Sequence, residues 1–378
     1  MNFSMNETEQ AIVDIATDVS RNVLKENAQK YDEAENFCVD SLKALGDLGF
    51  MGINLPEEYG GLGISSIAMS NVVAQVTAGC ASTASTLTAH FLATDSILIG
   101  ATEAQKQEYL PRCADGTLLG AFGLTEPAAG SNPAGMLTKA KRENNGWKIK
   151  GTKHYITNAA EADFIVLYAK TNEELKHKGI SAFIIPKGTE GVSFSNPEKT
   201  MGLKGSHIYE VSFDCWVPES ALMGLEGNGF NTAMEVLDRG RVEVAAMALG
   251  ISQAAIEYSL LWVKERMIGG KPLSSYQNTQ WKIAEMYTQY EAAELLTLKA
   301  AYARDFRERY SLESATAKLF ASEACAFITD NALQLHGGYG FIRDLPLERF
   351  VRDARILRIF EGTSEIQKLI ISRAVILG

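Results

Sequence analysis

Apolar residues in the first part of the chain recur at the spacing of amphipathic helices. The stretches "ETEQAIVDIATDVSRNVLKENAQKY" and "VDSLKALGDLGFMGINL" show this period before the turn-rich "PEEYGGLG". A longer stretch, "SIAMSNVVAQVTAGCASTASTLTAHFLATDSILIG", is rich in Ala, Ser and Gly, which favours close packing against another helix or a ligand. The pattern predicts an N-terminal helical domain over residues 1–117.

The pattern changes to short runs of β type between residues 118 and 227. "GWKIKGTKHYITNA", "DFIVLYAKT", "GISAFIIPKG" and "YEVSFDCWVP" are rich in β-branched and aromatic residues, and their spacing is typical of a sandwich or barrel. Four long helical patterns then fill residues 228–378, and their short connections indicate an antiparallel four-helix bundle. The expected fold class is therefore α+β with three domains.

Composition narrows the class of protein. The formal net charge of −10 argues against a general binder of nucleic acid or anionic membranes, which needs a basic surface. No apolar run is long enough for membrane insertion, and the N-terminus lacks the pattern of a signal peptide, so we expect a cytoplasmic protein. The five cysteines form no CxxC pair, which suits reduced core thiols better than disulfides or a metal site.

Several small-residue or charged motifs allow both a structural and a functional interpretation. In "GLTEPAAGSNPAG", Thr125, Gly130 and Ser131 either form a plain interstrand loop or bring donors close to a ligand's oxygens. Gly338 in "HGGYGF" follows a predicted helix, where it either caps the helix or lets a phosphate approach the backbone. Arg266 ends another predicted helix, as a partner of the helix dipole or of a pyrophosphate.

Two further motifs place charges on predicted helices. Asp238 and Arg241 in "LDRGR" lie three residues apart and so share a helix face, as a surface ion pair or as a ligand contact. In "FEGTSEIQ", the spacing of Ser364 and Gln367 predicts a capping box at a helix start. Glu361 precedes that start, and it is either a structural acid or a catalytic group.

In combination these motifs resemble the acyl-CoA dehydrogenase family over essentially the whole chain. "YGGLG", "FGLTEPAAGS", "GTKHYITNA", "QLHGGYGF" and "FEGTSEIQ" occur in the family's order and at its separations. The resemblance implies an N-terminal helical domain, a β-barrel and a C-terminal four-helix bundle. It also implies one non-covalent FAD per subunit, a homotetramer in which neighbours share FAD sites, and α,β-dehydrogenation of an acyl-CoA thioester.

The resemblance assigns roles to residues that match the family's motifs. The cofactor should contact Phe122, Leu124, Thr125, Gly130, Ser131, Tyr155, Ile156, Thr157, Arg266, Gln277, Gln334, Gly338, Thr363 and Glu365. The thioester substrate should contact Ser131, Asp238, Arg241 and Gly362. Glu361 should remove the substrate's α-proton while hydride leaves the β-carbon for the flavin, and its own backbone N–H should stabilise the developing enolate.

The chain departs from the family's usual residues at informative places. A minority of relatives carry the base in the "LDRGR" helix, but Gly240 occupies that position here; Glu243, one turn further on, is a conceivable second acid. Asn132 replaces a common aspartate. Ile268 and Gly269 stand where relatives often have a polar residue and a phenylalanine near the FAD adenine, which puts that contact in doubt.

Substrate and electron acceptor are left with alternatives. Thr86, Thr88 and His90 lie in the helix that floors the family's acyl pocket, either as packing residues or as a lining for a short, polar or cyclic acyl group. Such a group, for example a prolyl group, could be attached to an acyl-carrier protein in place of CoA. The acceptor is an electron-transferring flavoprotein or O2, and an enoyl-thioester reductase or an inactive scaffold relative are the competing functions.

Overall fold

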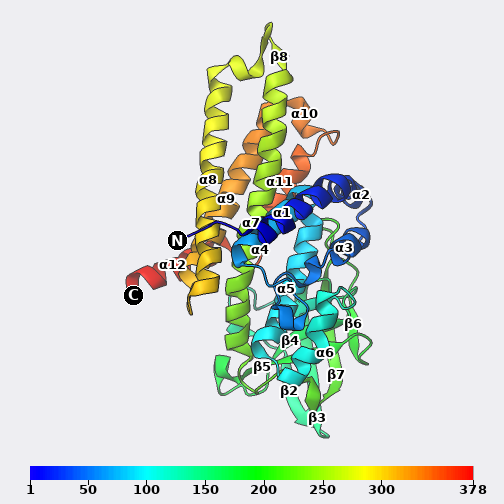
Figure 1. Cartoon of the computed structure of the whole chain (residues 1–378). Helices are drawn as coiled ribbons and strands as arrows, with labels where there is room; N and C mark the ends of the chain where they lie inside the picture. The colour runs from blue at the N-terminus through cyan, green and yellow to red at the C-terminus, as the bar shows by residue number, and fades with distance from the viewer. Residues whose placement is uncertain (378) are drawn as a thin grey trace.

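The computed structural model describes residues 1–377, and its N-terminal region is helical as predicted. Asn6 begins the first helix with a capping box, because its side chain accepts from the Glu9 N–H while the Glu9 carboxylate accepts from the Asn6 N–H. A π-helical turn, Ser20–Leu24, joins the first two helices. The helices of this region, shown in blue to cyan in Figure 1, are α1 (Glu7–Val19), α2 (Lys25–Ala34), α3 (Val39–Gly46), α4 (Ser66–Gly79), α5 (Ala81–Gly100) and α6 (Glu103–Ala114).

A seven-stranded sheet forms the middle region, which confirms the predicted β domain. The strand order is β1-β4-β2-β3-β7-β6, with β5 paired to β4. Along β7 the side chains alternate between buried and more exposed, as expected when one face of a strand packs on a core. The strands are β1 (Gly120–Gly123), β2 (Lys139–Glu143), β3 (Gly146–Thr157), β4 (Phe164–Lys170), β5 (Ile180–Pro186), β6 (Val192–Phe194) and β7 (Ile208–Pro218).

Helices also dominate the C-terminal region, and the four long ones match the four helical patterns of the sequence. They are α7 (Gly229–Glu265), α8 (Gln277–Phe306), α9 (Ser311–His336) and α12 (Ser364–Leu377). The sequence pattern did not reveal a small hairpin between α7 and α8, nor two short helices before α12. These elements are β8 (Met267–Ile268), β9 (Lys271–Pro272), α10 (Gly338–Phe341) and α11 (Leu347–Ile356).

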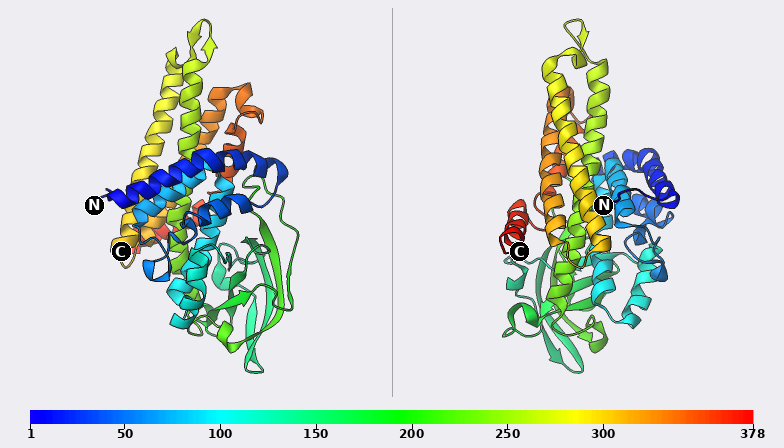
Figure 2. Two further views of the ribbon diagram at one scale, coloured as in Figure 1. Left: turned by 45° about the vertical axis from the view of Figure 1, so that its right-hand side comes forward. Right: turned by 60° about the vertical axis from the view of Figure 1, so that its left-hand side comes forward.

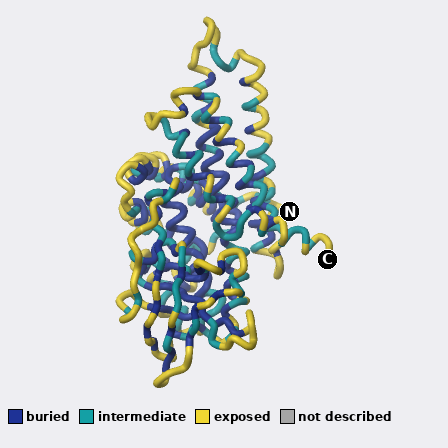
Figure 3. The backbone as a smooth tube through the Cα atoms, turned by 180° about the vertical axis from the view of Figure 1, so that it is seen from behind, coloured by how far each residue is buried: buried dark blue, intermediate teal, exposed yellow. Residues whose placement is uncertain are grey.

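Helix α7 is the central element of the molecule. It runs from the β domain to the far tip of the bundle and packs against α4, α5, α8 and α9 (Figures 1 and 2). It is long and apolar enough to cross a membrane, but 72% of its most apolar stretch is buried inside the protein, which identifies it as a core helix. Seen from behind in Figure 3, the buried residues follow its middle while its distal end is exposed.

Candidate active site

The turn that carries Glu361 lies between α11 and α12 and is held in an unusual conformation. Glu361 has a φ of 51° and Gly362 a φ of 93°, and a left-handed conformation is uncommon for a residue with a side chain. Lys318 Nζ on α9 donates to the Gly362 carbonyl at 2.7 Å, and Gln367 Nε2 donates to the same oxygen at 2.8 Å. Both donors are buried, so the turn is fixed from two sides.

Helix α12 begins at Ser364 as expected, but the predicted capping box is wrong by one residue. Thr363 Oγ1 accepts from the Ile366 N–H, so Thr363 caps the helix and Ser364 is its first residue. Ser364 Oγ instead donates to Glu323 on α9 at 2.6 Å. The Gln367 side chain, which the capping box needed, is used to hold the carbonyls of Glu361 and Gly362.

The Glu361 carboxylate rests against Gly240 of α7. A Cβ placed on Gly240 would lie 2.8 Å from Glu361 Cδ and closer still to Oε2. Although the residue as a whole is partly exposed, Oε2 is buried and has no hydrogen-bond partner within residues 1–377. Burial raises the pKa of Glu361 to about 7, against the opposing effect of the nearby Lys318 and Arg241 cations.

Asp238 and Arg241 share a face of α7, as their spacing predicted. Arg241 Nη1 donates to Asp238, and Ser314 Oγ on α9 also donates to this carboxylate at 3.3 Å. Arg241 is buried, and its Nε atom finds no acceptor in the part of the chain that the structure describes. Asp238 and Arg241 thus form a largely buried ion pair next to Glu361, in which one nitrogen of Arg241 has no hydrogen-bond partner in the described residues.

The two predicted flavin-facing segments of the β domain lie side by side. The His154 N–H on β3 donates to the Thr125 carbonyl, in the loop after β1, at 2.9 Å. Tyr155 has a φ of 57°, is 60% exposed and stacks on His154 at a ring distance of 4.0 Å. Ile156 is buried in the β-domain core, so only its backbone is available to a ligand.

Around these segments, the remaining candidates differ in exposure. Leu124 is buried, Phe122 and Thr157 are half-buried, and Gly130 and Ser131 are exposed. A Cβ on Gly130 would meet no atom within 4 Å, so the backbone there is open to a ligand.

A buried ion pair that the sequence analysis missed joins the same two segments. Lys153 Nζ donates to Glu126 Oε1 at 2.8 Å and to the Leu124 carbonyl at 3.0 Å. Glu126 in turn accepts from the backbone N–H groups of Leu137 and Thr138. Both charged side chains are almost fully buried and well satisfied. Glu126 lies in the "TEP" triplet and Lys153 in the "TKH" triplet, but a local sequence pattern cannot show that two residues 27 positions apart form a pair.

A pocket of about 660 Å³ gathers three predicted cofactor residues at the distal end of α7. Arg266, Gln334 and Gly338 line it, and Gln277 begins α8 immediately before the lining residues Asn278 and Thr279. The Arg266 guanidinium lies over the rings of Trp262 and Tyr339, at 5.8 and 5.7 Å from the ring centres. Gly337 and Gly338 have no neighbour within 4 Å of an added Cβ.

The hairpin beside this pocket explains the unusual glycine in "RMIGGKPL". Gly269 and Gly270 form the two-residue turn between β8 and β9, with φ of 57° and 79°. Positive φ at both positions is typical of a type I′ turn, which strongly favours glycine. Tyr276 Oη donates to the Ile268 carbonyl at 2.6 Å, and Ile268 itself lines the pocket. Gly269 thus forms part of the turn at the position where relatives often carry a phenylalanine, and Ile268 contributes an aliphatic side chain to the pocket.

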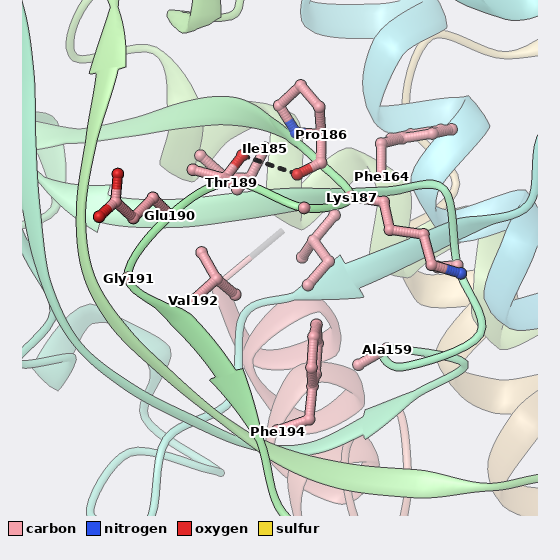
Figure 4. A pocket seen from close by; sticks show the side chains of 13 residues that line it. Ala159, Phe164, Ile185, Pro186, Lys187, Thr189, Glu190, Gly191, Val192 and Phe194 are labelled. Carbon is pink, nitrogen blue, oxygen red and sulfur yellow. Dashed lines mark hydrogen bonds between the residues drawn. The ribbon is translucent and has the colours of Figure 1, made fainter.

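A second pocket, of about 300 Å³, lies in the β domain around the β5–β6 connection (Figure 4). Its lining includes Phe164, Ile185, Pro186, Val192 and Phe194. None of the predicted site residues lines it, so it is separate from the candidate active site.

Three polar residues of α5, namely Thr86, Thr88 and His90, make hydrogen bonds within the protein, although His90 Nε2 has no partner in the described residues. His90 Nδ1 accepts from the Gly120 N–H at 2.9 Å, and burial lowers its pKa to about 4, so the imidazole is neutral. Thr86 Oγ1 accepts from Cys38 Sγ, and Thr88 Oγ1 donates to the Ser85 carbonyl at 3.2 Å. These contacts favour the packing interpretation of "STLTAHFLATDS" over a polar acyl pocket.

This geometry can be compared with known proteins. The domain models "Acyl-CoA dehydrogenase, N-terminal domain", "middle domain" and "C-terminal domain" match residues 6–117, 121–215 and 227–376. The chain is 41% identical to acryloyl-CoA reductase (NADH) of Anaerotignum propionicum, over 99% of this chain and 96% of that protein. Butyryl-CoA dehydrogenase of Megasphaera elsdenii superposes with a TM-score of 0.97 at 35% identity, covering both chains fully. A chain in the structure of the electron transferring flavoprotein of Acidaminococcus fermentans gives 0.98 at 39% identity, with both chains fully covered.

The three domain models and the relatives define the class of protein as the flavin-dependent oxidoreductases that act on acyl-CoA thioesters. The chain belongs to the acyl-CoA dehydrogenase family. It is an FAD-dependent enzyme whose reaction is the α,β-dehydrogenation of an acyl-CoA. The residues present fit the cofactor, because the glycine backbone at 130 and 338 is open, Tyr155 is exposed and Arg266 is available to an anion.

Proposed function

We propose that Glu361 is the proton acceptor in the α,β-dehydrogenation of a short-chain acyl-CoA. The observation that carries this proposal is the buried, unpartnered Oε2 of a carboxylate whose pKa is raised to about 7. A general base works best when its pKa lies near the working pH, and an ordinary exposed glutamate is too weak a base for this task. Gly240 occupies the position at which a minority of relatives carry the base, and it has no side chain.

The same turn offers a donor for the thioester oxygen. The Glu361 N–H has no acceptor within residues 1–377, and it belongs to the residue that would remove the proton. A free N–H placed there stabilises the negative charge that develops on the carbonyl oxygen as the α-proton leaves. Arg241, with its unpaired Nε, and the Asp238 that holds it are positioned to bind polar groups of the thioester arm.

Residues of two distant regions would hold FAD. Phe122, Thr125, Tyr155 and Thr157 would contact the flavin ring, with Leu124 and Ile156 packed behind it, and Gly130, Ser131, Thr363 and Glu365 would complete this part of the site. Arg266, Gln277, Gln334 and Gly338 would hold the pyrophosphate and adenosine. When bound, FAD accepts the hydride that leaves the substrate's β-carbon.

The separation of these regions supports a site shared between subunits. Twenty-six residues of α7 separate Gly240, beside Glu361, from Arg266, which at 1.5 Å per residue is about 39 Å. This exceeds the length of an extended FAD, so one molecule cannot contact both ends of the same helix. We infer that the distal pocket binds the FAD of a neighbouring subunit in a homotetramer. We further propose that this homotetramer is located in the cytoplasm.

The similarity to butyryl-CoA dehydrogenase supports a short acyl chain on CoA, and the internally bonded α5 residues give no support for a carrier-bound polar group. The similarity to a chain in the structure of the electron transferring flavoprotein of Acidaminococcus fermentans supports an electron-transferring flavoprotein as the electron acceptor. The acryloyl-CoA reductase relative makes the reverse reaction the second candidate, since the same carboxylate would then deliver a proton to the α-carbon.

Glu361→Gln tests the proposal. The expected result is an unchanged flavin absorbance spectrum and FAD content, with the rate of flavin bleaching by butyryl-CoA under anaerobic conditions reduced about 10²–10⁴-fold. Glu257→Gln, an equivalent change at an exposed glutamate of α7 that has no role in the proposed site, is the control for the substitution itself. Bleaching of Glu361→Gln at the wild-type rate would place the base elsewhere.

A further inference from the structure

Glu243 is a fully buried carboxylate that the proposed reaction does not use. It lies on α7 one turn beyond Gly240, and its Oε1 accepts from Arg304 Nη1 on α8 at 3.2 Å. Its Oε2 has no hydrogen-bond partner in the described part of the chain. An unsatisfied buried oxygen is costly, and such groups in a folded protein call for an explanation.

Arg304 does not belong to Glu243 alone. Its Nη2 lies 3.8 Å from Asp95 on α5, and Arg239 Nη1 donates to the same Asp95 at 3.0 Å. Asn54 also donates to Asp95 at 3.0 Å. Because Arg304 lies beside two carboxylates, it divides its charge between Asp95 and Glu243. Glu243 is therefore less than fully compensated by its cation.

The geometry brings this carboxylate close to the base. The Cβ position of Gly240 is 2.8 Å from Glu361 Cδ, and residues three apart on a helix have Cβ atoms about 5–6 Å from each other. The Glu361 carboxylate, which comes from the turn before α12, and the Glu243 side chain of α7 thus lie beside the same stretch of α7. The next residue on this face, Met247, contacts Thr88 of α5 at 3.7 Å, and the packing of α5 on α7 leaves Glu243 fully buried.

The charges that face the two acids come from four helices. Lys318 of α9 and Arg241 of α7 face Glu361, whereas Arg304 of α8 and Asp95 of α5 face Glu243. Two carboxylates this close in a buried site repel each other when both are ionised. Burial, reinforced by Asp95 and by Glu361, raises the pKa of Glu243, in agreement with that repulsion.

We propose that Glu243 is a positioning residue for the reaction, in that it and Glu361 share one proton in the resting enzyme and so set the protonation state of the base. This inference rests on the proposed role of Glu361. During dehydrogenation the substrate's α-proton binds to Glu361, the pair then holds two protons, and one is released to solvent after the product leaves. In the reductive direction the pair supplies the proton, and the two electrons travel as hydride in both cases.

Glu243→Gln tests the inference in the flavin-loaded enzyme. We expect the acid limb of the pH profile for flavin reduction by butyryl-CoA to move to lower pH by about one unit, the size of coupling at which two acids titrate as a pair. Infrared titration should show protonated carboxylic acid lost in two steps in the wild type. The same titration of Glu243→Gln and of Glu361→Gln should show a single step, at lower pH than the second step of the wild type.

Glu257→Gln is the matched control, because this glutamate is on the same helix but exposed, and it should leave the profile unchanged. An unmoved acid limb in a folded Glu243→Gln enzyme, or an infrared step of Glu243 that stays in place in Glu361→Gln, would overturn the pairing. The second measurement decides the matter if Glu243→Gln does not fold. Failure of the pairing leaves an inactive Glu361→Gln, whereas failure of the proposed function gives an active one.

Discussion

The two ends of α7 differ in how far their surroundings are buried. At the Gly240 end the surroundings are buried, tightly packed and charged, and the carboxylates of Glu361 and Glu243 each have an oxygen without a hydrogen-bond partner in the described residues. At the Arg266 end the pocket is open, a Cβ added to Gly337 or Gly338 would meet no atom within 4 Å, and the exposed Arg266 guanidinium lies over two aromatic rings. Burial tunes a reacting group, whereas exposure leaves donors free for a ligand.

The largest effect should come from filling the space at Gly240. Gly240→Ala places a methyl group against the Glu361 carboxylate and must displace it, because the added Cβ would lie 2.8 Å from Cδ. We expect flavin reduction to fall by about 10²-fold or more, since small misplacements of a catalytic group are costly. FAD content, measured by absorbance, should stay the same because the distal end is untouched.

Gly340→Ala is a useful companion, since that glycine also packs tightly, on α10, but away from Glu361. If both variants lose activity to the same extent, general loss of packing and not displacement of the base would be responsible.

The second-largest effect should come from breaking the Lys153–Glu126 pair, which holds the two flavin-facing segments together. Lys153→Met leaves Glu126 buried without its cation, which typically costs about 3–5 kcal/mol of stability. Urea unfolding of the FAD-free protein should show this loss, and the affinity for FAD should fall with it because the loops are no longer tied together.

The matched control is Lys148→Met on the same strand, whose partner Asp214 is exposed; surface pairs contribute about 0–1 kcal/mol. Equal losses in the two variants would contradict the special role of the buried pair.

A smaller effect is expected at the distal end. Arg266→Gln should weaken FAD binding about 10–100-fold, the equivalent of about 1.5–3 kcal/mol for a hydrogen bond to a charged group. Fluorescence titration of deflavinated protein measures this, with the exposed Lys264→Gln as control.

Mixing tests whether the ends belong to different subunits. If sites are shared, refolding Arg266→Gln together with Glu361→Gln at limiting FAD should restore activity, because some sites then combine two intact ends. No recovery above the separate variants would assign both ends to one subunit.

The last effect concerns the pH dependence of stability. The folded pKa of Glu361, about 7, lies above its ordinary value of 4.5, so its contribution to stability is fully present below pH 4.5 and is lost as the pH rises through 7. Glu361→Gln should therefore be more stable than the wild type at pH 8, by at most about 3 kcal/mol, and similar to it at pH 4. Thermal unfolding at both pH values checks the sign.

Hydrophobic periodicity was sufficient to predict the order of helices and strands, because the spacing of apolar residues within a single segment identifies long helices such as α7 and alternating strands such as β7. The motifs also indicated that Asp238 and Arg241 share a face. What sequence reasoning missed depends on contacts between distant segments. Lys153 with Glu126, and Glu243 with Arg304 and Asp95, become partners only after the chain has folded. The capping residue shifted from Ser364 to Thr363 because Glu323, on another helix, binds the serine.

The contact between Gly240 and Glu361 also constrains how this enzyme can evolve. A base on the helix and a base in the turn would occupy the same volume, so the two solutions exclude each other. A lineage that moves its base from one site to the other must lose the first side chain before or as it gains the second. Every single-step route passes through either a steric clash or an enzyme without a base. The location of the base should therefore change rarely, and the two positions should covary among descendants of this chain.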